Sequence, residues 1–259
     1  MKAVVFHGVG DIRLERVPEP TIEKPTDAIV RLTASAICGT DLHMIRGTMP
    51  GMVPGTILGH EGVGIVEAVG ADVRDITVGS RVVIPSTISC GHCSYCQTGY
   101  QSQCDNANPN GKTAGTAFFG GPKTSGPFNG LQAEFARIPL AESTLVELPA
   151  AVSDDQAILL SDIFPTAYYG AVEAEITIDF NRENPVERLK ELTDGIGVLR
   201  VIDAVGVDAY RPTEGPAYPE SRAMKSQFNE EQKEIMLEGS GKTWGGLWTP
   251  GDAPSQALS

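Results

Sequence analysis

Short apolar segments separated by glycine- and proline-rich turns dominate the chain up to about residue 150. Such segments are typical of β-strands, and they occur at residues 2–6, 12–17, 28–37, 62–69, 81–85, 131–138 and 145–148. The glycines of the run 62–69 leave room for another backbone to approach closely. Many short strands joined by turns of this kind favour a compact β-barrel.

Helical signals begin near residue 153. The run 153–156, Ser-Asp-Asp-Gln, precedes an apolar run. It predicts a helix to Asp162 with Ser153 as N-cap and Gln156 as the third helical residue of a capping box. A second helix is expected to begin around residues 165–170, because proline is tolerated in a first turn. Farther on, the pattern predicts an amphipathic helix, a buried strand and an acidic helix, at residues 185–192, 200–206 and 219–238.

The chain is strongly acidic. Its 259 residues carry a formal net charge of -13, and 41% of them are hydrophobic. This charge argues against nucleic acid and membrane partners, because both require basic protein surfaces. No apolar run approaches the roughly 20 residues needed to cross a bilayer. The chain also starts without a signal peptide, so we expect a cytoplasmic protein.

Possible metal ligands and proton carriers gather between Cys38 and Glu61. Cys38 and His60 are the natural first two ligands of a catalytic zinc ion, which keeps three protein ligands and leaves one position for substrate or water. Thr40 and His43 would share a face of one helical turn, where they could pass a proton between the site and solvent. A single cysteine and a single histidine are also common as core or surface residues, so both interpretations stay open.

The remaining cysteines, Cys90, Cys93, Cys96 and Cys104, lie in one short segment. Their spacing suits the four thiolate ligands of a closed, tetrahedral structural zinc site. Two disulfides are the alternative, and the expected cytoplasmic location argues against them. Because four sulfurs already fill such a site, His92 is expected to face solvent.

These motifs together resemble the zinc-dependent medium-chain alcohol dehydrogenases. The resemblance rests on the run 38–43, which reads CGTDLH, on Gly-His-Glu at 59–61 and on the cysteine segment 90–104. Two further runs are similar to the branch that contains glutathione-independent formaldehyde dehydrogenases. They are GTAFFGGP at 115–122 and LLSDIFPT at 159–166.

The resemblance is dense over residues 1–175, resumes at 178–207 and is weak at 248–258. It implies an α/β protein with a large β component. A GroES-like catalytic barrel would span 1–164, with a structural zinc lobe at 90–104, and a Rossmann-type cofactor domain would follow at 165–259. The implied activity is hydride transfer between an alcohol or a formaldehyde-like aldehyde and NAD, with two Zn²⁺ per chain.

The resemblance also assigns roles to single residues. Asp162 stands where this branch supplies the third ligand of the catalytic zinc, and a carboxylate is an acceptable zinc ligand. Asp41 would orient His60 from behind, as carboxylates commonly do. Glu61 would tune the metal or exchange onto it. Thr166 would lie near the nicotinamide.

Residues 105–130 are rich in glycine and lack periodicity. A plain surface loop is one interpretation, because long loops are often either functional or disordered. The resemblance implies instead a branch-specific insertion near the cofactor or substrate cleft. Phe118 and Phe119 could face that cleft or simply be buried.

The sequence departs from the family after residue 175. Relatives there enter a βαβ unit with a Gly-x-Gly-x-x-Gly turn, whose glycines let the backbone reach a pyrophosphate. The strand-like run 176–180 follows at once here, and Gly195-Ile196-Gly197 lacks the third glycine. We therefore expect an incomplete Rossmann-like domain that is shortened internally and at its C-terminal end.

Two functions follow from this conflict. The first is a zinc-dependent alcohol or aldehyde dehydrogenase, supported by the metal-ligand pattern. The second is a catalytically silent zinc-binding fragment or interaction protein, supported by the missing dinucleotide turn. A half-built sheet would expose an apolar face, which predicts a homo-oligomer.

Overall fold

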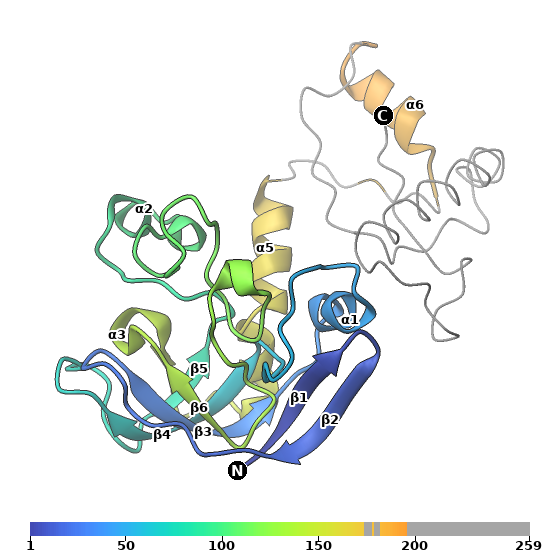
Figure 1. Cartoon of the computed structure of the whole chain (residues 1–259). Coiled ribbons are helices and arrows are strands. Elements are labelled where there is room, and N and C mark those ends of the chain that lie inside the picture. Colours follow the sequence, from blue (N-terminus) through green and yellow to red (C-terminus); the bar gives the residue numbers. More distant parts are fainter. Residues whose placement is uncertain (174–177, 179–181, 196–259) are drawn as a thin grey trace. The chain divides into compact units, whose positions relative to one another are not determined.

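The computed structural model describes residues 1–173, 178 and 182–195 (Figure 1). Contacts divide the chain into two compact units, Met1–Tyr169 and Gly170–Ser259. The domain boundary expected after residue 164 stays a prediction. The strand expected at 200–206 and the helix expected at 219–238 lie outside the described residues.

The first unit is built on antiparallel strands. A five-stranded sheet has the order β6-β3-β4-β5-β7, and its strands are β3 (Ala28–Ser35), β4 (Gly62–Val69), β5 (Arg81–Ile84), β6 (Phe135–Ile138) and β7 (Val146–Glu147). A hairpin of β1 (Lys2–Gly8) and β2 (Asp11–Arg16) forms a second sheet. All seven expected strands are present, although β3, β5, β6 and β7 are shorter than the apolar runs that predicted them.

The hairpin is attached to the rest of the unit through β1. Ala3 bridges to Ala133 and Val5 to Ile57, while the backbone amide of Val4 donates to the carbonyl of Gln132 at 2.9 Å. These contacts place the segment that carries Gln132 between the hairpin and the larger sheet.

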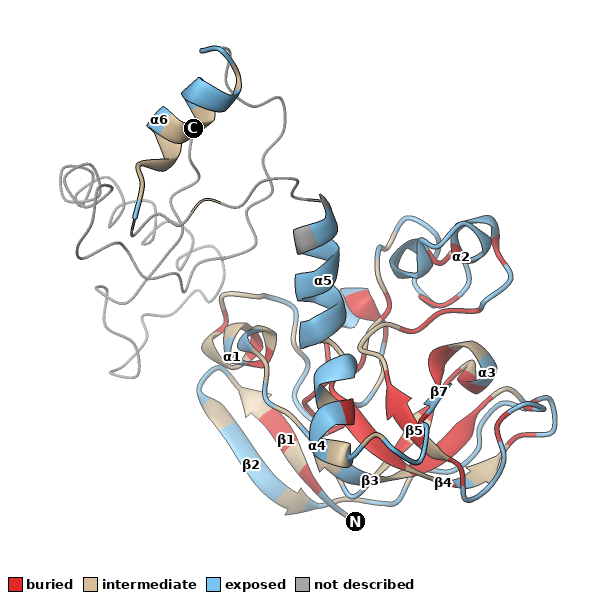
Figure 2. Cartoon of the chain, turned by 180° about the vertical axis from the view of Figure 1, so that it is seen from behind, coloured by how far each residue is buried: buried red, intermediate tan, exposed pale blue. Residues whose placement is uncertain are grey.

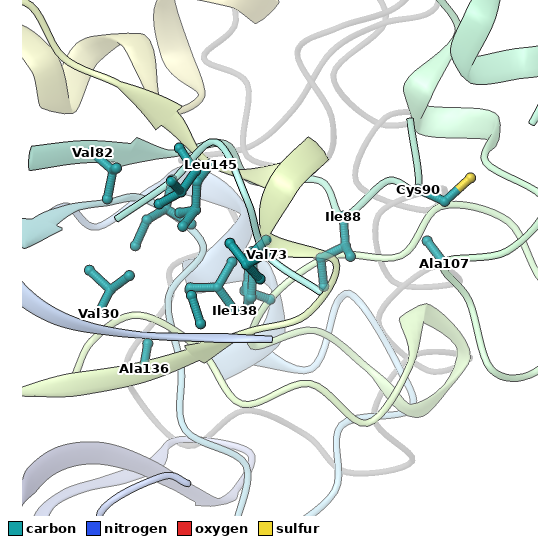
Figure 3. Packing of buried hydrophobic residues seen from close by; sticks show 14 of the residues in the cluster. Val30, Val73, Val82, Ile88, Cys90, Ala107, Ala136, Ile138 and Leu145 are labelled. Atoms are coloured by element: carbon teal, nitrogen blue, oxygen red, sulfur yellow. The ribbon is translucent and has the colours of Figure 1, made fainter. Parts of the chain in front are cut away.

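Alternation along the strands divides the buried apolar side chains of the larger sheet between two clusters, of which the smaller includes Val63 and Val83. The larger cluster includes Val30, Val82, Ala136, Ile138 and Leu145, all buried (Figures 2 and 3). Burial of each Val or Leu side chain contributes roughly 1.5–3 kcal/mol. The same cluster continues through Ile88 to Cys90 and Ala107 (Figure 3), so the cysteine segment is packed onto the core of the barrel.

Short helices fill the connections. They are α1 (Gly39–Arg46), α2 (Ser94–Gln97), α3 (Ala141–Thr144), α4 (Asp154–Ala157), α5 (Ile163–Glu173) and α6 (Pro185–Leu192), with 3₁₀ turns η1 (Gln101–Gln103), η2 (Lys123–Ser125) and η3 (Ile158–Leu160). None of the helices in the described part is long and apolar enough to cross a membrane.

The predicted capping box is confirmed. The amide of Gln156 donates to Oγ of Ser153 at 3.3 Å, and the amide of Ser153 donates to Oε1 of Gln156 at 3.1 Å. The helix expected to continue to Asp162 is instead two pieces, α4 and η3. The amide of Ser161 bonds to the carbonyl of Ile158, which is the tighter 3₁₀ pattern.

The glycine at position 64 gives a test of how closely β4 lies against β3. A Cβ added there would lie 2.4 Å from the carbonyl oxygen of Arg31 and 2.5 Å from Cγ1 of Val30. We expect Gly64→Ala to lower the free energy of unfolding by about 1–3 kcal/mol, the usual cost of overpacking, as measured by urea denaturation. Gly8→Ala is the matched control, because nothing lies within 4 Å of its added Cβ. Equal losses in both variants would contradict the prediction.

Candidate functional site

Four possible metal ligands from three distant segments meet beside the larger sheet. Cys38 is the N-cap of α1, His60 and Glu61 directly precede β4, and Asp162 lies between η3 and α5. One ligand atom from each of the four residues lies within 4.8 Å of the others. We call this group the mixed-donor cluster.

The start of α1 fixes Cys38 through its backbone. The amide of Cys38 donates to Oδ2 of Asp41 at 2.9 Å, so the carboxylate satisfies a donor at the helix N-terminus. Nε2 of Gln132 donates to the same oxygen at 3.1 Å. Asp41 is 1% exposed, and both donors hold its carboxylate in one orientation.

His60 lies between two carboxylates. Its Nδ1 is 3.3 Å from Oδ1 of Asp41, and its Nε2 is 3.4 Å from Oδ2 of Asp162. Nδ1 of His60 and Oδ1 of Asp41 are both buried, and neither has a well-aligned hydrogen bond to any other described residue. Asp41 therefore faces Nδ1 of the ring, and Nε2 faces Asp162 of the mixed-donor cluster.

A close backbone approach makes this placement possible. Gly59 has φ of +92°, and an added Cβ would lie 2.5 Å from Cγ of Gln132. Only glycine fits a left-handed backbone with so little space. The residue before His60 is thus constrained by the same Gln132 that holds Asp41.

The carboxylate of Asp162 is held by two hydroxyl groups. Thr166 Oγ1 donates to its Oδ1 at 2.9 Å, and Ser86 Oγ donates to the same atom at 3.3 Å. Oδ2 is then the oxygen that faces His60. Sequence reasoning missed Ser86, since nothing in the local pattern links it to residue 162.

The charges of the cluster are strongly coupled. Burial opposes the charged form of His60, but its hydrogen bonds to Asp162, Asp41 and Cys38 outweigh burial and raise its pKa to about 12. The hydrogen bond to His60 lowers the pKa of both Cys38 and Asp162, whereas desolvation raises the pKa of Glu61. These hydrogen bonds favour the charged forms of Cys38 and Asp162, and a divalent cation that binds His60 would displace the proton of the imidazole.

The two predicted proton carriers have different surroundings. Oγ1 of Thr40 lies 3.8 Å from Sγ of Cys38, so Thr40 is beside the cluster. Nδ1 of His43 is 2.9 Å from Oγ1 of Thr48. The sequence analysis did not foresee Thr48, which lies just beyond the left-handed Gly47 that ends α1.

The adjacent Phe118 and Phe119 of the loop 105–130 have different surroundings. Phe119 is fully buried in the main apolar cluster. Phe118 is half-buried, and its ring meets that of His60 edge-on, with centroids 6.3 Å apart and an interplanar angle of 82°. The loop therefore contributes an aromatic side chain to the surroundings of the mixed-donor cluster.

The other cysteines form a second group, the four-sulfur cluster. The Sγ atoms are 3.5 Å apart for Cys93 and Cys96, 3.9 Å for Cys93 and Cys104, and 4.0 Å for Cys90 and Cys96. A disulfide requires about 2.05 Å, and all the cysteines are free thiols. A tetrahedron with Zn–S bonds of about 2.3 Å has edges of about 3.8 Å, so the cluster fits a structural zinc site.

Hydrogen bonds favour negative charge on these sulfurs. Backbone amides, foremost that of Cys96, lower the pKa of Cys93 to about 6. Nδ2 of Asn106 donates to Sγ of Cys90 at 3.2 Å. Burial, by contrast, raises the pKa of the Cys96 thiol to about 12, a cost that a bound cation would offset. His92 is exposed and bonds to the carbonyl of Cys90, in keeping with its expected place outside the ligand set.

The chain is similar to known proteins of one family. Residues 24–150 match the alcohol dehydrogenase GroES-like domain. The chain is 39% identical over 178 residues to an uncharacterized zinc-type alcohol dehydrogenase-like protein, AdhB, of Bacillus subtilis, covering 68% of this chain and 47% of that protein. It is 38% identical over 212 residues to the medium chain reductase/dehydrogenase ucsI of an Acremonium species, covering 82% and 67%.

A third relative supports the expected branch. The glutathione-independent formaldehyde dehydrogenase of Pseudomonas aeruginosa is 35% identical over 187 residues, covering 68% of this chain and 45% of that protein. Among solved structures, alcohol dehydrogenase TADH from Thermus sp. ATN1 aligns with a TM-score of 0.63 at 29% identity, covering 75% and 68%. The GroES-like fold is confirmed. The chain spans about half the length of most of these curated relatives.

The four-sulfur cluster yields a metal-dependent stability prediction. Cys93→Ser removes a thiolate ligand, so we expect bound zinc to fall by one ion per chain and the free energy of unfolding to fall by more than about 3 kcal/mol, because loss of a structural metal is among the largest single-residue effects. Metal analysis and thermal denaturation measure both quantities. Ser94→Ala, an exposed neighbour, is the control, and an unchanged zinc content in Cys93→Ser would exclude the site.

Proposed function

The chain belongs to the medium-chain, zinc-type alcohol dehydrogenase family, and from this premise we propose that it is a zinc-dependent oxidoreductase that transfers a hydride between an alcohol or aldehyde and NAD. The observation that carries the proposal is the convergence of Cys38, His60 and Asp162 on one point, with Glu61 beside them. Three protein ligands are the number typical of catalytic zinc.

The donor atoms suit the proposed metal. Zinc binds thiolate sulfur, imidazole nitrogen and carboxylate oxygen, and when bound it would polarise the substrate oxygen as a Lewis acid. Asp41 keeps Nε2 of His60 directed at the cluster, which is the usual task of a carboxylate behind a histidine ligand. We assign Cys38, His60 and Asp162 as the ligands and Glu61 as a residue that tunes the metal or exchanges onto it.

The proposed proton path uses α1. Oγ1 of Thr40 lies 3.8 Å from Sγ of Cys38 and would receive the hydroxyl proton of the alcohol. His43 lies one helical turn farther along the same helix and would deliver that proton to solvent. The two residues thereby act as a relay, and neither is a metal ligand.

We propose a small substrate, in the range of formaldehyde and short alcohols. The formaldehyde dehydrogenase of Pseudomonas aeruginosa, 35% identical over the matched residues, acts by its name on such an aldehyde. The ring of Phe118 stands edge-on to His60 and would narrow the approach to the metal. A bulky substrate would have to displace this ring.

NAD is the proposed hydride acceptor, with Thr166 nearest the nicotinamide. Because Thr166 bonds to Asp162 at 2.9 Å, a nicotinamide beside Thr166 would also be beside the metal. The sequence nevertheless contains no Gly-x-Gly-x-x-Gly turn, so no residues for the pyrophosphate are assigned. That observation favours the second candidate, a catalytically silent zinc-binding or interaction protein.

Calorimetric titration with NAD⁺ and with NADH separates the two candidates. The protein is first loaded with zinc, and the metal content is assayed on the same sample. For a dehydrogenase we expect two zinc ions per chain and dissociation constants in the micromolar range. Two zinc ions without any nucleotide binding would reject the dehydrogenase and leave the zinc-binding protein.

Asp162→Asn tests the mixed-donor cluster without disturbing the core. The side chain of Asp162 is 21% exposed, and the amide has the same shape but is a poor zinc ligand. We expect one zinc ion per chain to be lost, with the thermal midpoint changed by only a few degrees. Asp155→Asn, an exposed carboxylate of α4, should retain both ions. Retention of both by Asp162→Asn would remove Asp162 from the ligand set.

We also propose that the protein forms a homo-oligomer. Large apolar side chains along η3 and α5 are exposed, among them Leu159, Ile163, Phe164 and Tyr168. Contiguous apolar surface of this kind commonly marks an interface. We expect size-exclusion chromatography with light scattering to give a mass above that of one chain, and a clean monomer at all concentrations would contradict this proposal.

A further inference from the structure

We propose that Ser161 is a positioning residue whose buried hydroxyl sets the place of Asp162 relative to His60 and thereby the metal affinity of the mixed-donor cluster. The inference rests on the proposed function, in which Asp162 and His60 are metal ligands. Ser161 touches neither the metal site nor the substrate, and it acts through its neighbour in the chain.

The hydroxyl of Ser161 closes the end of the β4–β5 ladder. Its Oγ accepts a hydrogen bond from the amide of Gly62 at 3.1 Å and donates to the carbonyl of Ile84. Gly62 and Ile84 are directly opposite each other in the antiparallel pairing of the two strands. One side-chain oxygen therefore bonds to the first residue of β4 and the last residue of β5.

These backbone contacts lead to both candidate ligands. Gly62 follows His60 and Glu61 in the chain, so the strand end that Ser161 holds is the one that carries His60. Ser161 is also bonded to the segment after β5, because the amide of Ser86 donates to the carbonyl of Ser161 at 3.2 Å. Ser86 Oγ in turn donates to Asp162. The distance between His60 and Asp162 therefore depends on how Ser161 is bonded to the ends of β4 and β5.

Packing does not provide this restraint. Among residues 158–164, Ser161 is the buried one, at 2% exposed, while Leu159, Ile163 and Phe164 are all more than half exposed. Thr166 also bonds to Asp162, but it lies on α5 and is itself exposed. A buried serine surrounded by exposed apolar neighbours reverses the usual preference, which its two backbone hydrogen bonds explain.

The decisive variant is Ser161→Ala, measured against Ser80→Ala. Ser80 is also largely buried, lies next to the opposite end of β5 and donates its hydroxyl to Glu147 at 3.1 Å. Zinc affinity is determined by competition with a chromophoric chelator, and Co²⁺ absorption reports the geometry of each cluster. We expect Ser161→Ala to bind zinc 10–100-fold more weakly at the mixed-donor cluster, the usual effect of removing a supporting hydrogen bond, with an altered Co²⁺ spectrum there. The four-sulfur cluster of Ser161→Ala and both clusters of Ser80→Ala should have the zinc affinity and the Co²⁺ spectrum of the unmodified protein.

The outcomes separate this inference from the proposed function. Ser161→Ala with unchanged affinity and an unchanged Co²⁺ spectrum would overturn the inference alone. Unmodified protein that binds zinc only at the four-sulfur cluster would overturn the proposed function and the inference with it.

A second measurement decides the case in which Ser161→Ala does not fold. Hydrogen exchange of the Gly62 amide is compared in unmodified protein with both clusters loaded and with only the four-sulfur cluster loaded. If the inference holds, zinc binding at the mixed-donor cluster and the hydrogen bond between Gly62 and Ser161 stabilise each other. We therefore expect slower exchange of Gly62 when the mixed-donor cluster is filled, and an unchanged rate would overturn the inference.

Discussion

The buried contact between Asp41 and His60 is the interaction on which the mixed-donor cluster depends. One oxygen of Asp41 faces Nδ1 of the imidazole, and the other accepts the amide of Cys38. A single carboxylate therefore holds two of the potential ligands, although they come from opposite ends of a long loop. Burying a carboxylate without partners would be costly, and Oδ2 of Asp41 accepts bonds from the Cys38 amide and from Gln132, while its Oδ1 faces His60 at 3.3 Å.

Local patterns predicted the elements well, because strand alternation and capping chemistry are properties of short segments. The structure has β4 at Gly62–Val69 and α6 at Pro185–Leu192, within the bounds that the sequence indicated. The four-sulfur cluster could also be predicted from the sequence, since all four cysteines lie in one short segment. The predicted helix to Asp162 is instead α4 followed by the 3₁₀ turn η3, and the sequence contains no local sign of this change.

Long-range partners were beyond sequence reasoning. Gln132 reaches Asp41 and Ser86 reaches Asp162 across the sheet, and no periodicity links such positions. Asp162 itself was identified through the family resemblance, because an aspartate after an apolar run has many possible roles. The ring partner of His43 was missed for a related reason: the turn at Gly47 brings Thr48 back toward α1.

The two clusters also differ in how far apart their residues lie along the chain. The sulfurs come from the segment 90–104, whereas the mixed-donor cluster joins residues 38, 60 and 162. The entropy lost on closing a loop grows with its length, and distant contacts form late in folding. A nascent chain can thus capture one ion in its cysteine loop while the remainder is still disordered. An ion at the mixed-donor cluster would instead require the barrel to be folded first, so under the proposed function the two ions would bind at different stages of folding.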